Sequence, residues 1–271
     1  MKIALYYRHI DHESKPCLDE LVDILHSKGI ATCELHDGDS ADGCDYLCSI
    51  GGDGTLLSTV QYIHCDNPAA FPPILGINFG HLGFLTTVGK ENLHGMVEEL
   101  LAGRFTLEDR TLLQLSTLHF PLSTSYALNE VFVHRTEEAS LLRTEVYVDN
   151  LFVATYAGDG VIVATPTGST AYSLSCGGPI LTPDSRCLAI TPISAHTLTL
   201  RPIIIPDTAQ IRLHVCNDCF LGIDSSRTTL AGGTDLTLNR APFAIRLVRL
   251  GNQNFFTAIR DKLMWGSEVR N

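Results

Sequence analysis

The chain has 271 residues, of which 45% are hydrophobic and 18% charged, and its formal net charge at pH 7 is -11. This apolar content supports one large core or two modest ones and argues against disorder, and no apolar run is long enough to span a membrane. The acidic balance excludes a nonspecific nucleic-acid binder with a basic face, and it means that anionic ligands must be held by local groups.

Short apolar strands alternate with helices over about the first 105 residues. The helix predicted at 15–28 follows from the i, i+3, i+4, i+7 spacing of Leu18, Leu21, Val22 and Leu25, and Gly29 ends it. Alternating strands and helices predict crossover connections and a parallel sheet. The other elements predicted here are strands at 1–7, 46–50 and 73–78 and helices at 56–63 and 93–101.

From about residue 106 the pattern becomes β-rich, with Asp149-Asn150 as a hairpin turn. A last helix is predicted at 255–265. We therefore expect a Rossmann-like α/β domain over 1–106, a β-rich, sandwich-type domain over 107–250, and a C-terminal segment, 251–271, that packs back on the first domain. The β-rich runs in the second domain are 112–118, 126–134, 145–156 with the hairpin turn inside it, 161–164, 203–205, 211–215 and 244–250.

Nine cysteines stand at irregular spacing. Cys216 and Cys219 form a single CxxC pair without a second pair at zinc-finger distance. The N-terminal apolar run is broken by Arg8 and lacks a small-residue cleavage site, which favours a buried strand over a signal peptide. For the nine cysteines, free thiols in a reducing cytoplasm are a better interpretation than a structural zinc site or a redox dithiol.

The first chemical motif, Gly51-Gly52-Asp53-Gly54-Thr55, joins a predicted strand to a predicted helix. Its glycines permit close approach of a phosphate, and a helix N-terminus favours an anion. The motif is neither GxxxxGK[ST] nor GxGxxG. A carboxylate here repels phosphate unless Asp53 accepts a proton from an attacking hydroxyl or helps to bind a divalent cation. The structural alternative is that Asp53 caps the helix.

A second motif runs from Gly158 to Ser173 and continues to Gly177-Gly178-Pro179. In it a buried strand leads into a hydroxyl-rich turn, Thr165-Pro-Thr-Gly-Ser-Thr170, and Tyr172 follows as a ring for stacking or packing. Two shorter signals are Asn129-Glu130 within an apolar run, and His196-Thr-Leu followed by Arg201-Pro202. The chain has no GxSxG elbow, which argues against a hydrolase.

Together these residues resemble the NAD kinase family, in its ATP-dependent bacterial type, over most of the chain. The segment 51–55 is similar to that family's phosphate-site motif, and 78–85 to its N-x-G-x-L-G-F-L stretch. The family's NE pair, its glycine- and threonine-rich segment and its HTL-x-x-RP element are matched by 129–130, 159–175 and 196–202. This order is specific, whereas GGDGT alone also resembles lipid kinases and phosphofructokinases.

The resemblance implies transfer of the γ-phosphoryl group of ATP to the 2′-hydroxyl of the adenosine ribose of NAD, which gives NADP. It implies that Asp53 is the proton acceptor, that Asn129 and Glu130 hold the adenosine portion, and that Asp159 engages the nicotinamide-riboside half. The residues that would bind the ATP phosphates are Gly51, Gly52, Gly54 and Thr55. The residues that would line the NAD pocket are Asp53, Gly54, Thr170, Ala171, Tyr172, Ser173 and Ser175.

The resemblance also implies a divalent cation, Mg²⁺, without assigning its protein ligands, and a homo-dimer or tetramer without nucleic-acid or membrane partners. Phe79, Thr87 and Ala157 depart from the commoner family pattern, which leaves the preference between NAD and NADH open. Two alternatives remain at this point. One is a lipid or sugar kinase with the same glycine turn, and the other is a dinucleotide sensor without catalysis.

Overall fold

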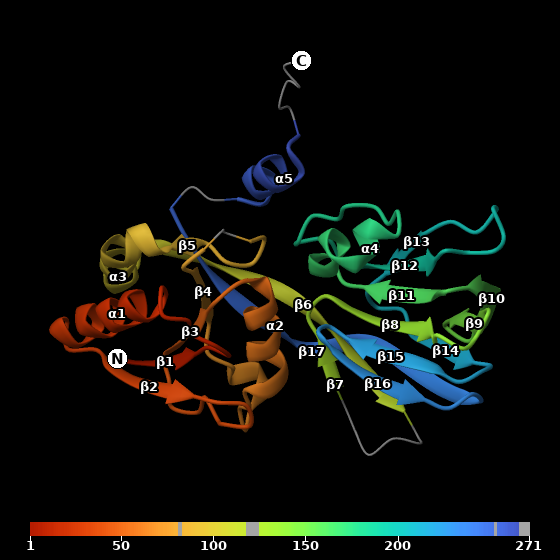
Figure 1. Cartoon of the computed structure of the whole chain (residues 1–271), viewed down its shortest axis with the longest axis horizontal. Coiled ribbons are helices and arrows are strands. Elements are labelled where there is room, and N and C mark those ends of the chain that lie inside the picture. The colour runs from red at the N-terminus through yellow and green to blue at the C-terminus, as the bar shows by residue number, and fades with distance from the viewer. Residues whose placement is uncertain (81–82, 118–124, 252–253, 266–271) are drawn as a thin grey trace. The chain divides into compact units, whose positions relative to one another are not determined.

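The computed structural model describes residues 1–80, 83–117, 125–251 and 254–265. It forms two compact units, one of Met1–Asp109 with Ile245–Asn271 and the other of Arg110–Ala244 (Figure 1). Two long strands, β6 (Phe105–Thr117) and β17 (Thr234–Leu250), contribute residues to both units. No helix in the described part of the chain is long and apolar enough to cross a membrane.

The first unit is built on a parallel sheet in the order β2-β1-β3-β4, with β5 and Leu247 of β17 also pairing in parallel with β4. This confirms the parallel α/β domain. Its strands are β1 (Lys2–Tyr6), β2 (Ala31–Leu35), β3 (Tyr46–Ile50), β4 (Ile74–Asn78) and β5 (Val88–Gly89). Its helices are α1 (Lys15–Ser27), α2 (Asp53–Tyr62), α3 (Leu93–Leu101), α5 (Phe255–Leu263) and the short 3-10 turns η1 (Pro68–Ala70) and η2 (Lys90–Asn92).

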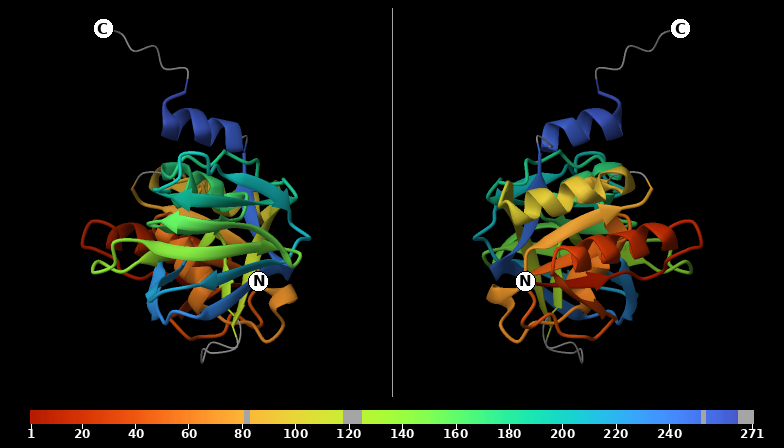
Figure 2. Two further views of the ribbon diagram at one scale, coloured as in Figure 1. Left: turned by 90° about the vertical axis from the view of Figure 1, so that its right-hand side faces the viewer. Right: turned by 90° about the vertical axis from the view of Figure 1, so that its left-hand side faces the viewer.

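Two of these helices, α1 and α3, lie side by side over one face of the sheet (Figures 1 and 2). Leu18 and Leu21 of α1 and Met96 of α3 share one buried cluster with Ile50 and Ile77, the side chains that β3 and β4 turn toward these helices. The strands β3 and β4 are buried along almost their whole length, as expected for parallel strands covered on both faces. The sheet fixes the end of β3, where the first motif begins, and the end of β4, where the stretch 78–85 begins.

The second unit packs two antiparallel sheets around one apolar core, which confirms the predicted β-sandwich. One sheet has the order β13-β12-β11-β8-β15-β16, and the other contains β10-β9-β14 and the first part of β17. The strands are β7 (Ser125–Ala127), β8 (Glu130–Arg135), β9 (Leu142–Val148), β10 (Leu151–Gly158), β11 (Gly160–Ala164), β12 (Cys187–Ile193), β13 (Ile203–Pro206), β14 (Ile211–Val215), β15 (Cys219–Ile223) and β16 (Ser226–Leu230).

Most predicted elements are present, with a few corrections. Asp149 (φ 50°) and Asn150 (φ 65°) form the predicted hairpin turn, and the C-terminal helix is confirmed as α5. The β-rich run predicted at 126–134 consists of two strands, because Leu128 and Asn129 separate β7 from β8. Helix α2 begins at Asp53 rather than at Leu56. Leu118, the last residue of the strand predicted at 112–118, lies outside the described residues.

Candidate active site

The glycine turn connects β3 directly to α2. Gly51 has φ +145°, and a Cβ there would lie 2.3 Å from the side-chain oxygen of Thr55, so only glycine fits. Gly52 occupies the N-cap position of α2 and has extended backbone angles. Because the first N–H groups of a helix have no acceptor within the helix, they point outward from this turn and favour an anion.

Asp53 is the first residue of α2, and its carboxylate does not cap the helix, so the capping alternative is wrong. The carboxylate instead accepts backbone hydrogen bonds from Phe84 at 2.8 Å, Leu85 at 3.1 Å and Thr86 at 3.2 Å. A Cβ at Gly83 would lie 1.9 Å from Asp53 Oδ1. The family-like stretch 78–85 therefore forms the cradle of Asp53, although His81 and Leu82 lie outside the described residues.

Gly54, which follows Asp53 in the chain, and Gly83, which lies against its carboxylate, make a matched pair of variants. A Cβ at Gly54 meets nothing within 4 Å in the described structure, so Gly54→Ala should keep or slightly raise the free energy of unfolding. We expect it to lower ATP affinity about tenfold, because the methyl group occupies space that a phosphate needs. Gly83→Ala should displace the Asp53 carboxylate and reduce kcat by about 10-fold or more. Steady-state kinetics and urea unfolding of both variants check these expectations. If the two variants changed KM and kcat equally, the separate roles of Gly54 in phosphate binding and of Gly83 in placing Asp53 would be contradicted.

In the second unit, Asn129-Glu130 and the hydroxyl-rich turn pack against each other. The Thr165 N–H donates to the Asn129 carbonyl at 2.9 Å, and the Thr165 hydroxyl donates to the Leu128 carbonyl at 2.6 Å. A Cβ at Gly168 would lie 2.1 Å from the Asn129 carbonyl oxygen, so this glycine permits the close approach. Two motifs that are far apart in the sequence thus form one buried corner.

Asp224 holds this corner in place. It is a residue with φ 47° in the turn between β15 and β16, and its carboxylate accepts the N–H groups of Leu128 at 2.7 Å, Asn129 at 2.8 Å and Glu130 at 3.0 Å. Burial raises the pKa of Asp224 to about 6, although the three N–H donors favour its charged form. The sequence analysis missed this residue, because no motif marks Asp224 and it acts only through the fold.

Glu130 lies beside Asp224 with only 5% of its surface exposed. Its burial, and secondly the charge of Asp224, raise the pKa of Glu130 to about 8, against a backbone hydrogen bond from Tyr172 that lowers it. Glu130 Oε2 is buried and has no hydrogen-bond partner among the described residues. Three N–H donors can be satisfied only by an acceptor, so Asp224 carries the negative charge of this pair and Glu130 is the neutral partner at neutral pH.

The hydroxyl-rich turn itself contains η3 (Thr167–Thr170), and α4 (Tyr172–Ser175) follows it. Thr170, Ala171 and Tyr172 are partly exposed and Ser175 is exposed, so these four can reach a ligand. The Tyr172 ring packs edge-on against Phe132 with 5.4 Å between ring centroids. Ser173 is fully buried and its hydroxyl shares a 2.9 Å hydrogen bond with Thr191, so Ser173 supports this segment from within.

Asp159, at the turn from β10 to β11, is paired with Arg135. Arg135 Nε donates to Asp159 Oδ1 at 2.6 Å, and the same guanidinium donates to the Ala139 carbonyl at 2.9 Å. The hydrogen bond from Arg135 lowers the pKa of Asp159. The His196 N–H bonds the Ala157 carbonyl near this turn, whereas Arg201 donates to the carbonyls of its own loop, Leu198 and Leu200.

The Arg135 pair gives a second prediction. Arg135→Met should leave the Asp159 carboxylate without its fixed orientation, and we expect KM for NAD to rise about fivefold with kcat changed less than twofold. Arg143→Met, at an exposed arginine of β9, is the control and should change neither constant. A fall in kcat without a change in KM would show that Arg135 does not act on dinucleotide binding.

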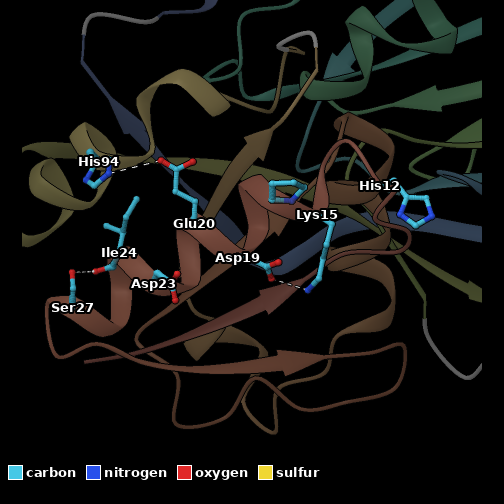
Figure 3. A pocket seen from close by; sticks show the side chains of 9 residues that line it. His12, Lys15, Asp19, Glu20, Asp23, Ile24, Ser27 and His94 are labelled. Carbon is cyan, nitrogen blue, oxygen red and sulfur yellow. Dashed lines mark hydrogen bonds and ion pairs between the residues drawn. The ribbon is translucent and has the colours of Figure 1, made fainter.

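A separate hollow on the outer face of α1 does not belong to this site (Figure 3). Its charged groups are exposed and partly paired with each other, with 2.8 Å between Lys15 Nζ and Asp19 Oδ1 and 3.8 Å between His94 Nε2 and Glu20 Oε1. The lining comes from the segment before α1, from α1 and from α3, and consists of His12, Lys15, Pro16, Asp19, Glu20, Asp23, Ile24, Ser27 and His94. The hollow therefore contains no residue of the glycine turn or of the second motif.

Comparison with known proteins decides the family. Residues 10–105 match the ATP-NAD kinase N-terminal domain, and residues 128–250 match the ATP-NAD kinase C-terminal domain. The chain belongs to the ATP-NAD kinase family. The match over both units favours this family over the lipid- or sugar-kinase alternative, which shares only the glycine turn.

Relatives and solved structures agree with the family. An NAD kinase of Flavobacterium johnsoniae is 34% identical over 100% of both chains, and one of Porphyromonas gingivalis is 42% identical over 83% of this chain and 78% of the relative. An Archaeoglobus fulgidus NAD kinase solved with ATP has a TM-score of 0.79 and 25% identity, covering 97% of this chain and 99% of that one. Yeast NADH kinase, solved with NADH, has a TM-score of 0.88 and 24% identity over 100% of this chain and 89% of that one, and it supports the fold.

Proposed function

We propose that this NAD kinase transfers the γ-phosphoryl group of ATP to the 2′-hydroxyl of the adenosine ribose of NAD, with Asp53 as the proton acceptor. The observation that carries the proposal is the fixed carboxylate of Asp53 at the N-terminus of α2, in the same turn as the phosphate-binding glycines. Phosphoryl transfer has a loose transition state, so an acceptor that takes the proton late is sufficient. Catalysis then depends mostly on alignment of the ribose oxygen with the γ-phosphorus.

The remaining residues bind the two substrates. Gly51, Gly52, Gly54 and Thr55 hold the ATP phosphates, because their turn combines close backbone approach with a helix N-terminus. Asn129 and Glu130 hold the adenosine portion of NAD, and Asp159 its nicotinamide-riboside half. The pocket is completed by partly exposed or supporting groups, namely Thr170, Ala171, Tyr172, Ser173 and Ser175.

A divalent cation, Mg²⁺, completes the proposed reaction. Within the described ranges no group of three or more His, Cys, Asp or Glu side chains is placed to hold a metal. Mg²⁺ keeps several waters and is usually bound through one or two carboxylates together with substrate phosphates, so a cation carried by the ATP phosphates does not require such a group. When bound, the cation neutralises phosphate charge, while the chain itself contributes the N–H groups of the glycine turn and the Asp53 carboxylate.

We also propose a cytoplasmic homo-oligomer, a dimer or a tetramer. All nine cysteines are free, which supports a reducing compartment. Edge strand β10 exposes Leu151, Phe152 and Val153 by 73%, 58% and 40%, and a contiguous apolar segment of this kind favours association. Light scattering of the purified protein measures the subunit number, and a monomer at micromolar concentration would contradict the oligomer.

The decisive test is product formation. Purified protein is incubated with NAD, ATP and Mg²⁺, and NADP is detected with an NADP-specific dehydrogenase. We expect NADP from NAD and no phosphorylated product from 2′-deoxy-NAD, which lacks the accepting hydroxyl. Binding of NAD without formation of NADP would instead support the sensor alternative, and a phosphorylated lipid or sugar would support a different kinase.

A further inference from the structure

Arg249 lies on β17 behind the loop that holds Asp53. Successive side chains of β17 point to opposite faces of the strand. Val248 and Leu250 belong to the apolar cluster under α1 and α3, so Arg249 points to the other face. The Arg249 side chain is only 12% exposed. Its Nε donates to Glu108 Oε2 at 2.6 Å, so the cation is paired with a carboxylate of β6 in the same unit. A buried guanidinium with two remaining nitrogens must find further acceptors.

Those acceptors are the carbonyls of the cradle of Asp53. Arg249 Nη1 donates to the Leu85 carbonyl at 3.2 Å, and Nη2 makes a longer contact with the Phe84 carbonyl at 3.4 Å. The Phe84 carbonyl belongs to the same peptide group as the Leu85 N–H, and the Leu85 carbonyl to the same group as the Thr86 N–H. Both of these N–H groups donate to Asp53 Oδ1, at 3.1 Å and 3.2 Å. Two peptide groups are therefore held between a guanidinium and the carboxylate.

We propose that Arg249 is a positioning residue for phosphoryl transfer and acts on Asp53 through these two peptide groups. The inference rests on the proposed role of Asp53 as proton acceptor. A cation at the carbonyl end of a peptide group polarises it and strengthens the hydrogen bond made by its N–H. Arg249 thereby keeps the Asp53 carboxylate oriented without touching either substrate.

The loop 84–87 is held by β4 at one end and by Arg249 at the carbonyls of Phe84 and Leu85. Thr86 packs against the bare backbone of β4, where a Cβ at Gly76 would lie 2.9 Å from Thr86 Cα. The Thr87 N–H donates to the Gly76 carbonyl at 3.0 Å, so β4 holds one end of the loop. The carbonyls of Phe84 and Leu85 point away from Asp53, and Arg249 is the cation that binds both of them. Glu108 balances its charge and fixes its direction.

The first test separates positioning from binding. We expect Arg249→Met to lower kcat about 10- to 30-fold with KM for NAD and ATP within threefold, and Arg249→Lys, which keeps one cationic donor, to recover most of the loss. The control is Arg246→Met on the same strand, whose guanidinium donates at 3.1 Å to the Phe71 carbonyl. It should leave kcat and both KM values unchanged.

The second test shows whether the effect passes through Asp53. In an Asp53→Asn background, Arg249→Met should lower kcat further by less than about twofold, because effects along one pathway are not additive. Full additivity, or an unchanged kcat in Arg249→Met, overturns the inference while the role of Asp53 stands. Normal turnover of Asp53→Asn instead overturns the proton acceptor. If Arg249→Met fails to fold, Arg249→Gln, which keeps amide donors without the charge, takes its place in both tests. If Asp53→Asn has no residual turnover, the loss of kcat without a change in KM and its recovery in Arg249→Lys decide.

Discussion

Asp53→Asn is expected to lower kcat by about 10²- to 10⁴-fold while NAD affinity stays within about threefold, because an amide cannot accept the proton of the ribose hydroxyl. The side-chain size is unchanged, so the glycine turn and α2 should persist. One local cost is expected. In the wild type the Asp53 carboxylate accepts hydrogen bonds from three backbone N–H groups. An asparagine that turns its NH2 toward one of these N–H groups loses that hydrogen bond.

Single-turnover kinetics and NAD titration measure the two parts of this prediction separately. Asp45→Asn is a suitable control, because the Asp45 carboxylate also accepts a backbone N–H, that of Lys2 at 2.7 Å, but lies outside the glycine turn. The control should keep its turnover. Full activity of Asp53→Asn would remove the proton acceptor and leave Asp53 as a structural anchor of the 84–86 loop.

The role of the Asp53 side chain shows how far sequence reasoning reaches. A carboxylate among phosphate-binding glycines suggested two chemical roles and one capping role, and none of these includes the contact that the structure shows. Asp53 is held by N–H groups about thirty residues later in the chain. This contact requires β3 and β4 to be neighbours in the sheet. The periodicity of the sequence predicts a parallel sheet, but it does not predict the order of the strands in that sheet.

Local patterns predicted the elements that carry their own signal. The helix α1 has a clear 3.6-residue period and a glycine stop, and the β9–β10 hairpin has an Asp-Asn turn whose residues adopt positive φ. Strand β2 was missed, because its ATCEL sequence is only partly buried and reads as polar. The break between β7 and β8 was missed because no turn residue marks it in the sequence. Asn129 is held there by contacts with Thr165 and Gly168, which are distant in the chain.

The site in the second unit required the fold even more. Asn129 and Glu130 were expected to be functional from their resemblance to a family pair, but a dipeptide alone does not indicate that Glu130 is buried. The residue that orients both, Asp224, follows an ordinary apolar strand, and its positive φ of 47° is invisible in the sequence. Buried polar groups of this kind are recognised only when their donors and acceptors are counted in three dimensions.

The second large effect concerns stability and pH at Glu130. Its pKa is raised in the folded chain from 4.5 to about 8, so the folded state binds this proton more tightly than the unfolded state. The resulting stabilisation is fully present below the unfolded pKa and is lost as pH rises through about 8. Glu130→Gln keeps the shape and cannot ionise. We therefore expect the free energy of unfolding of the variant, relative to that of the wild type, to rise by about 4 kcal/mol between pH 5 and pH 9.

Urea unfolding of both proteins at a series of pH values, without ligands, measures this difference. Asp224 titrates in the same direction but is present in both proteins, so its contribution largely cancels. Glu138→Gln, at an exposed glutamate of the β8–β9 connection, should follow the wild type at every pH. A constant difference between Glu130→Gln and the wild type would mean that Glu130 is already ionised in the folded chain. The pair would then place two charges in one buried corner, where three N–H groups bind Asp224 and the backbone of Tyr172 donates to Glu130.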